Sequence, residues 1–354
     1  MRTLALVMIA RDESRCIERC IVSARPWVDE VIVLDTGSVD DTAQRAAAAG
    51  ARVHHFVWVD DFAAARNAAL DIANADWCLV LDADEWIAGA ADLLAALRSQ
   101  PGDFIGQVTV ASVFDQPGGS TSEAPSWLSR VLPRGVRYAG RVHEQPQSLL
   151  PRRRLPLVVG HDGYRDAQMG AKRGRNCHLL QLALAEHPDD AYLRYQLGKD
   201  LEVRGQFDAA VVHYTDAYGR MEPQAAWRHD LVLRLLFSLK KTGSFEQAVS
   251  LADAEMPHWQ HSPDFFFTLG DLFLDWAACA PERASELLPM IESSWTRALA
   301  IGENPQLQDT VRGRGSFLAA HNLAVLHATL GRAAQAQAWR EREAALRAAS
   351  VGAV

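Results

Sequence analysis

The 354-residue sequence predicts an α/β domain built on a mostly parallel sheet, followed by an all-α domain of helix pairs. Up to about residue 165, short apolar runs alternate with amphipathic stretches, which is the pattern of βαβ units. From about residue 189 onward, the pattern changes to helix pairs without a strand signal. We therefore expect a sheet-containing domain over residues 1–165, a connecting helix over 166–188 and a helical domain over 189–354.

Strands and helices alternate along the first domain. The predicted strands are residues 3–10, a run ending at Asp35, residues 51–58 and residues 76–84, and the predicted helices are residues 15–27, 41–49 and 62–75. Ligands of open α/β sheets bind beyond the carboxyl ends of the strands. The stretches ARDE, DTGS, VDDF and DADE should therefore meet at the ligand-binding edge of the sheet.

The second domain carries a weak internal repeat. Small and aromatic residues recur at the spacing of tetratricopeptide repeats, and Gly243 follows Gly205 by 38 residues. A degraded copy begins at residue 265, and Gly331 and Ala336 mark a last one. An unrelated helical bundle is the alternative, but matched positions in more than one copy favour repeats. The matched positions of the first two copies are Leu197, Gly198, Leu201, Gly205, Phe207, Ala210, Tyr214 and Ala217, then Gly243, Phe245, Ala248 and Ala252.

The composition is that of an ordinary globular protein, with 49% hydrophobic and 23% charged residues. A net charge of -8 and a pI near 5.8 argue against non-specific nucleic-acid binding, which needs a basic surface. Apolar runs such as Leu4–Ala10 are much shorter than the roughly 20 residues of a membrane span, and this run has no basic leader. We therefore expect a cytoplasmic protein without nucleic-acid or membrane partners. The five scattered cysteines lack zinc-type pairing and are expected to be plain thiols.

Three carboxylates crowd the end of the last predicted strand. Asp82, Asp84 and Glu85 lie within four positions, directly after the apolar run WCLVL. Unpaired carboxylates at the rim of a core would repel one another at a cost of roughly several kcal/mol. A divalent cation is the expected partner, since Mg²⁺ and Mn²⁺ take carboxylate oxygens and keep positions open for substrate phosphates. Helix capping or a surface turn is the alternative for the two aspartates, and Glu85 either orients a metal-bound water or faces solvent.

The D-x-D sequence follows DTGSVDDT and DDFAAARNAAL in the same α/β frame. Together these stretches resemble the nucleotide-sugar domain of the family-two glycosyltransferases, which have the GT-A fold, a Rossmann-like mixed sheet. The resemblance covers about residues 3–165. It implies a nucleotide-sugar donor and a divalent cation, Mn²⁺ or Mg²⁺, as cofactor.

The resemblance also implies roles for individual residues. Asp35 would bind the base, and Asp82 and Asp84 would hold the sugar nucleotide and its metal, with Asp84 as the direct ligand. Arg66 would bind phosphate or sugar hydroxyls, and its alternative is a surface arginine paired with Asp61 or Asp71. The residues of the first loop that would contact the nucleoside are Ile9, Ala10, Arg11 and Glu13.

The stretch WLSRVLPRGVRYAGRVHEQP resembles the end of the catalytic domain in the bacterial branch of the family. It has Arg130, assigned to the donor site, and Tyr138, Gly140, His143 and Glu144, whereas Leu132 replaces the usual phenylalanine. An inverting transfer needs a base that takes the acceptor proton as the nucleophile attacks. Because most enzymes of the family use an acidic residue here, Glu144 is the favoured base; His143, another aspartate or a purely structural role for the pair are the alternatives.

The segment that follows contains one further histidine and a basic cluster. The same resemblance implies that His161 contacts the metal or a phosphate, and its alternative is a plain linker histidine. Lys172, Arg173 and Arg175 either cover the diphosphate or form a solvated helix start.

The combined features predict a metal-dependent glycosyltransferase that moves a sugar from a nucleotide-diphosphate donor, with a UDP-linked donor as the favoured one. The family resemblance implies inversion at the anomeric carbon. The acceptor would be a polypeptide side chain or a glycan, as in the bacterial peptide S- and O-glycosyltransferases and lipopolysaccharide core glycosyltransferases that the architecture resembles. The helical repeats would capture the acceptor or form a homodimer. The alternatives are a sugar nucleotidyltransferase, although IARDESRC lacks the glycine-rich loop of that class, and an inactive repeat-based scaffold.

Overall fold

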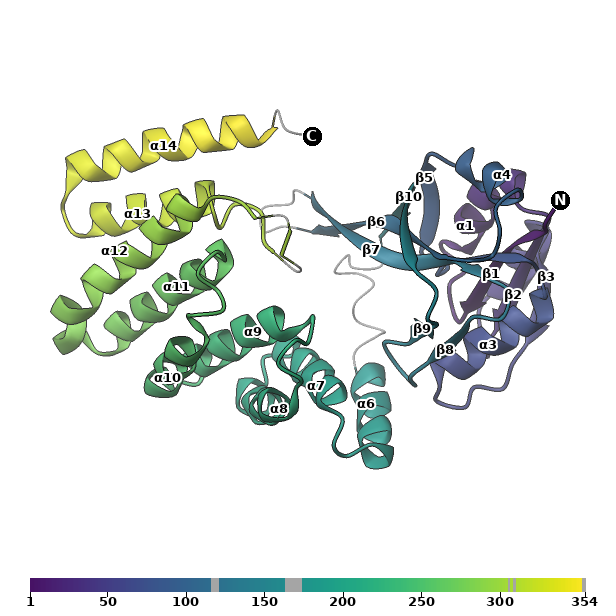
Figure 1. The fold of residues 1–354 in the computed structure, drawn as a ribbon, viewed down its shortest axis with the longest axis horizontal. Coiled ribbons are helices and arrows are strands. Elements are labelled where there is room, and N and C mark those ends of the chain that lie inside the picture. Colours follow the sequence, from purple (N-terminus) through teal and green to yellow (C-terminus); the bar gives the residue numbers. More distant parts are fainter. Residues whose placement is uncertain (116–120, 163–173, 305, 308–309, 352–354) are drawn as a thin grey trace. The chain divides into compact units, whose positions relative to one another are not determined.

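The computed structural model describes residues 1–115, 121–162, 174–304, 306–307 and 310–351. The chain divides into two compact units, Met1–Ala183 and Leu184–Val354 (Figure 1). The first contains an eight-stranded mixed sheet and the second contains helix pairs, which confirms the predicted fold class. The boundary lies within helix α6 (Arg175–Glu186), inside the stretch for which the sequence predicts a connecting helix. Residues 166–173 of that stretch lie outside the described residues.

The sheet of the first unit has the strand order β3-β2-β1-β4-β7-β6-β10-β5. Strands β1 to β4 are mutually parallel where they pair, β7 is antiparallel to both β4 and β6, and β10 is parallel to β6. Strands β8 and β9 form a separate two-stranded sheet. The elements are β1 (Leu4–Ala10), α1 (Ile17–Ala24), the 3-10 helix η1 (Arg25–Trp27), β2 (Glu30–Asp35), α2 (Thr42–Ala48), β3 (Arg52–His55), α3 (Phe62–Ala73), β4 (Trp77–Val80), β5 (Glu85–Gly89), α4 (Leu93–Leu97), β6 (Ile105–Asp115), β7 (Thr121–Pro133), β8 (Arg137–Ala139), β9 (Gln145–Gln147) and β10 (Arg152–His161).

Two apolar clusters, one on each face of the sheet, explain the continuous apolar runs of β1 and β2. Leu6 and Met8 pack with α1 on one face, whereas Ala5 and Val7 pack with α3 on the other. A strand buried on both faces has no polar positions, so its sequence does not alternate. All five cysteines are free thiols, and four of them are buried.

Strand directions bring the carboxyl ends of strands β1, β2, β4 and β10, among others, to one edge of the sheet. Strands β1, β2 and β4 are parallel, and β10 runs the same way because β7 is antiparallel to β4 and to β6, with which β10 is parallel. Ala10, Asp35 and His161 end their strands at this edge, and Asp82 and Asp84 follow β4 there. Strand β5, which begins at Glu85, was not predicted, because the five residues EWIAG carry too little pattern.

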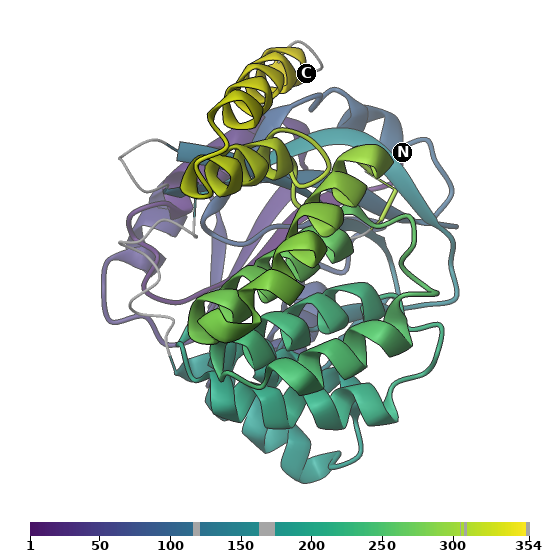
Figure 2. The ribbon, with the colours of Figure 1, turned by 90° about the vertical axis from the view of Figure 1, so that its left-hand side faces the viewer.

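The second unit consists of successive helices, which Figure 2 shows from teal to yellow. Among the described residues, no helix combines the length and the hydropathy that crossing a membrane requires. The helices after α6 are α7 (Ala191–Val203), α8 (Phe207–Arg220), α9 (Arg228–Lys241), α10 (Phe245–Glu255), α11 (Pro263–Cys279), the 3-10 helix η2 (Pro281–Arg283), α12 (Ala284–Ile301), α13 (Phe317–Thr329) and α14 (Ala333–Val351).

Three of the predicted repeat copies share one turn geometry. Gly205, Gly243 and Gly331 connect the paired helices with φ angles of 72°, 74° and 72°. In each turn the amide after the glycine donates to the carbonyl five residues before it, as from Gln206 to Leu201 at 2.9 Å. The left-handed φ strongly favours glycine, and the turn satisfies carbonyls at the end of the first helix. The glycines that recur in the sequence therefore mark the turns of a repeated helix–turn–helix unit.

Candidate functional site

The carboxylate of Asp82 lies between two arginines from other elements. Arg66 of α3 donates from Nη2 to Oδ1 at 2.7 Å, and Arg130 of β7 donates from Nη2 to Oδ2 at 2.8 Å. Both arginine side chains are buried, whereas 36% of the Asp82 side chain is exposed. Burial favours the protonated acid, but the two guanidiniums outweigh it and lower the pKa of Asp82. Asp82 is therefore an ionised, partly accessible carboxylate held in one orientation.

The same two arginines hold two further carboxylates. Arg130 Nη2 donates to Glu85 Oε1 at 2.5 Å, and Arg66 Nε donates to Glu144 Oε1 at 2.5 Å. Glu85 is only 2% exposed and its Oε2 accepts from the backbone amide of Asp82 at 2.9 Å. Burial first, and then the neighbouring Asp82, raise the pKa of Glu85. The repulsion expected at the end of β4 is thus relieved by buried guanidiniums at Asp82 and Glu85.

These contacts correct two of the alternative interpretations. Glu85 does not face solvent, because its side chain is enclosed beside Arg130. Arg66 is not a surface arginine paired with Asp61 or Asp71. Instead, Asp61 caps α3 by accepting from the amide of Ala64 at 2.8 Å, and Asp71 pairs with Arg137.

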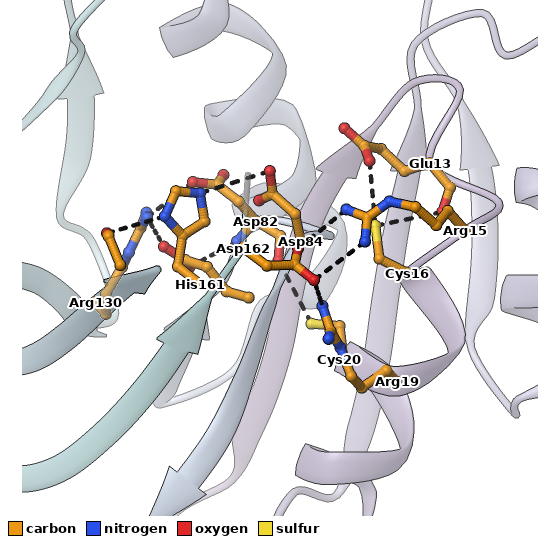
Figure 3. Close-up of polar contacts among 12 residues, drawn as sticks. Glu13, Arg15, Cys16, Arg19, Cys20, Asp82, Asp84, Arg130, His161 and Asp162 are labelled. Atoms are coloured by element: carbon orange, nitrogen blue, oxygen red, sulfur yellow. Dashed lines mark hydrogen bonds and ion pairs between the residues drawn. The ribbon is translucent and has the colours of Figure 1, made fainter. Parts of the chain in front are cut away.

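Asp84 and His161 form a separate pair at the same edge (Figure 3). His161 Nε2 lies 3.6 Å from Asp84 Oδ2, and both side chains are largely buried. The other ring nitrogen, Nδ1, lies 3.0 Å from Ser112 Oγ of β6, so Nε2 is the nitrogen turned to Asp84. Burial disfavours the imidazolium, but Asp84 and its acidic neighbours outweigh burial and raise the pKa of His161. Within the described part of the chain, no three His, Cys, Asp or Glu side chains are grouped to hold an ion by themselves.

The loops after β1 and β2 are tied together by hydrogen bonds. The buried Asp35 accepts from the amides of Ser38 at 3.2 Å and Gly37 at 3.4 Å, and its Oδ2 lies 3.3 Å from His55 Nδ1. The amide of Glu13 donates to Thr42 Oγ1 at 2.7 Å. These bonds fix the loop that carries the predicted nucleoside contacts. Arg11 is exposed, Ile9 and Glu13 are half-buried and Ala10 is buried; their nucleoside contacts and the base-binding role of Asp35 stay predictions.

The turn with both candidate bases lies beside Arg66. His143 is exposed and has a left-handed φ of 53°, whereas the Glu144 side chain is 11% exposed. Asn67 braces the preceding strand, because its side chain donates to the Tyr138 carbonyl at 2.9 Å and accepts from the Tyr138 amide at 2.8 Å. Burial raises the pKa of the Tyr138 phenol to about 12. The geometry ties Glu144 to the arginine and Asp82 cluster.

Two further features of the site involve arginines whose contacts the sequence does not indicate. Arg15 and Arg19 both bind Asp162, the residue after His161. Arg175, at the start of α6, lies with its guanidinium 5.0 Å from the ring centre of Phe62. Burial lowers the pKa of Arg175 against the opposing effect of Glu13 and other acids nearby. The other members of the basic cluster, Lys172 and Arg173, lie outside the described residues.

Comparison with known proteins gives the family of most of the sheet-containing unit. Residues 5–143 match the model of glycosyl transferase family 2. A TPR repeat-containing protein of Synechococcus elongatus is 36% identical over 270 residues, which are 72% of this chain and 66% of that protein. The SPbeta prophage-derived glycosyltransferase SunS of Bacillus subtilis is 25% identical over 219 residues, 59% of this chain and 51% of that protein. The chain thus spans about two thirds of the first relative and about half of the second.

Solved structures give a partial likeness. One is glucosyl-3-phosphoglycerate synthase from Mycobacterium tuberculosis in complex with Mg²⁺ and uridine-diphosphate. It has a TM-score of 0.26 and 30% sequence identity, over 32% of this chain and 44% of that chain.

Proposed function

Residues 5–143 form a glycosyl transferase family 2 domain, and from this premise we propose that the protein is an inverting glycosyltransferase that uses a nucleotide-diphosphate sugar. The observation that carries the proposal is the pairing of Asp84 with His161 beside the Asp82, Arg66 and Glu144 cluster, at the edge where α/β sheets bind ligands. A UDP-linked donor follows from the family resemblance.

Asp84 and His161 are suited to hold Mn²⁺ or Mg²⁺. Two ligands at about 2.1 Å in adjacent octahedral positions lie about 3 Å apart, close to the observed 3.6 Å. Carboxylate oxygens suit both ions, and an imidazole nitrogen favours the transition metal. The remaining positions would be filled by water and by the donor diphosphate. When bound there, the ion would act as a Lewis acid toward the departing diphosphate.

Asp82 is proposed to orient the donor sugar rather than to have a purely structural role. Its two oxygens already accept from Arg66 and Arg130, yet more than a third of the side chain is exposed. A carboxylate held by two buried guanidiniums cannot rotate freely, so a sugar hydroxyl that donates to it would be placed in one position. Its assignment as a second metal ligand stays a prediction.

Glu144 is proposed as the general base. Arg66 donates to Oε1 of Glu144, which leaves Oε2 to take the proton from the acceptor group. This transfer occurs as the nucleophilic atom of that group bonds to the anomeric carbon. At the same time the bond from that carbon to the diphosphate oxygen breaks, and the nucleoside diphosphate leaves with the electron pair. His143, exposed on a left-handed backbone, is the alternative base.

The helical unit is proposed to capture the acceptor, a polypeptide or a glycan, or to form a homodimer. Stacked helix pairs present extended concave surfaces that suit an extended chain. The TPR repeat-containing relative supports this proposal, since its match extends over 72% of the present chain and so beyond the family 2 domain.

A donor panel tests the proposed function. The purified chain is incubated with nucleotide sugars in Mn²⁺ or in EDTA, and the released nucleoside diphosphate and the melting temperature are recorded. One donor should be hydrolysed slowly and should raise the melting temperature only in Mn²⁺. Pyrophosphate exchange with a sugar phosphate would identify a nucleotidyltransferase instead. If no nucleotide sugar binds or reacts, the domain is a scaffold and the proposal is wrong.

A further inference from the structure

Asp162 is bound at both carboxylate oxygens by two arginines from α1 or the turn before it. Arg15 donates from Nη2 to Oδ1 at 3.0 Å and from Nη1 to Oδ2 at 3.1 Å. Arg19 donates from Nη2 to Oδ2 at 2.8 Å (Figure 3). The Asp162 side chain is 14% exposed. A bidentate pair with a third charge-assisted hydrogen bond fixes the orientation of the carboxylate more firmly than a single surface contact does.

This carboxylate is attached to both halves of the candidate metal pair. Asp162 directly follows His161 at the end of β10, and its amide donates to the carbonyl of Asp84 at 3.4 Å. One residue thus connects the backbone that carries the imidazole with the backbone that carries the acid.

Arg19 extends the connection to the start of β5. Its guanidinium lies 3.8 Å from the ring centre of Trp86. That ring fills the space beside Gly160, where an added Cβ would lie 2.4 Å from the indole. Helix α1, the turn between β4 and β5, and the end of β10 are therefore held against one another next to the Asp84 and His161 pair.

We propose that Asp162, bound by Arg15 and Arg19, is a positioning residue that sets the separation of Asp84 Oδ2 and His161 Nε2 and thereby the affinity of the site for a divalent ion. The proposal rests on the proposed function, because it takes that pair as the metal ligands. Groups that orient metal ligands typically change metal affinity by about 10- to 100-fold when removed. The same ion pairs add less to folding than fully buried pairs would, because both arginines are half-exposed to solvent. The two effects can therefore be separated.

The test is a titration of the full chain with Mn²⁺ alone, with free Mn²⁺ followed by electron paramagnetic resonance. Asp162→Ala should raise the Kd for Mn²⁺ about 10- to 100-fold and leave the metal-free melting temperature within about 3 °C of the wild type. Asp162→Glu should restore part of the affinity. Asp71→Ala, which removes the exposed ion pair with Arg137, is the matched control and should leave the Kd unchanged. With the preferred donor, Asp162→Ala should need more Mn²⁺ for half-maximal turnover but approach the wild-type rate at saturation.

The outcomes separate this proposal from the proposed function. If the wild type binds Mn²⁺ and Asp162→Ala binds it equally well, the positioning role is wrong while the glycosyltransferase assignment stands. If the wild type does not bind Mn²⁺ and hydrolyses its donor in EDTA, the metal pair and the positioning role both fail. Should Asp162→Ala not fold, the double variant Arg15→Lys, Arg19→Lys keeps both charges but loses the bidentate geometry. It should still weaken Mn²⁺ binding several-fold, and an unchanged Kd would overturn the proposal.

Discussion

Replacing Arg130 by methionine tests whether the arginines, and not a metal alone, neutralise the carboxylates after β4. Arg130 Nη2 lies 2.8 Å from Asp82 Oδ2 and 2.5 Å from Glu85 Oε1. Methionine fills much of the same volume but leaves Glu85, which is 2% exposed, beside Asp82 without its cation. Removing one partner of a buried ion pair lowers the free energy of unfolding by about 3 to 5 kcal/mol. For the sheet-containing unit this corresponds to a melting temperature lower by roughly 6 to 20 °C at pH 7.5.

The pH dependence of this loss follows from the charges. In the wild type the guanidiniums lower the pKa of Asp82, so that carboxyl contributes stability above its unfolded pKa and loses it as pH falls through the folded pKa. In the Arg130→Met variant the pKa of Glu85, already raised by burial, should rise further. A buried carboxyl with a raised pKa lowers the free energy of unfolding at high pH, where it is ionised, and this destabilisation disappears as the carboxyl takes up a proton. The difference in unfolding free energy between wild type and variant should therefore shrink from pH 7.5 to pH 5.

Urea melts of the full chain, without metal and at both pH values, measure this difference. Arg134→Met is the matched control, because Arg134 is half-exposed and its pair with Asp76 at 3.3 Å should contribute less than about 1 kcal/mol. Adding Glu85→Gln to Arg130→Met should recover part of the loss, since the uncompensated charge is removed. A loss below about 1 kcal/mol at pH 7.5, or an equal loss at both pH values, would show that Arg130 does not compensate these carboxylates.

Three further outcomes are expected. Asp84→Ala should lower transfer at least 100-fold and abolish Mn²⁺-dependent donor binding without unfolding the chain; retention of more than about a tenth of the activity would remove Asp84 from the metal site. Glu144→Gln should lower turnover about 100-fold with nearly unchanged donor affinity, and a normal rate in this variant together with a loss in His143→Ala would move the base to His143. In the helical unit, burial raises the pKa of Asp271 to about 6 from the ordinary 3.8. Ionisation of this carboxyl therefore lowers the free energy of unfolding as pH rises through this range, by at most about 3 kcal/mol. Asp271→Asn should therefore melt higher than the wild type at pH 7.5 but not at pH 4, and equal melting curves at pH 7.5 would contradict the raised pKa.

The sequence predicted those features that depend on local pattern. The apolar runs of β1, β2 and β4 and the repeated glycine turns were identified because their residues lie close together in the chain. Strand β5 was missed, since Glu85–Gly89 is too short to show a period. The partners of Asp82 were not identifiable either, because Arg66 lies 16 residues before it and Arg130 lies 48 residues after it. Only the fold brings them together.

The crowded carboxylates showed that positive charge was needed but not its source. A divalent ion and a pair of arginines satisfy the same electrostatic requirement, and the sequence led us to expect the ion, because the two arginines lie far from the carboxylates in the chain. The structure places the arginines at Asp82, Glu85 and Glu144, and it leaves Asp84 with His161. Three carboxylates then face two guanidiniums and the fourth, Asp84, faces the imidazole of His161, so the net charge is about -2 when all four are ionised and the imidazole is neutral. One divalent cation would cancel this negative charge, so the arginines and the proposed metal are complementary parts of one site. Removal of an arginine should change the affinity of the site for the metal, and removal of the metal should change the affinity for the groups that the arginines bind.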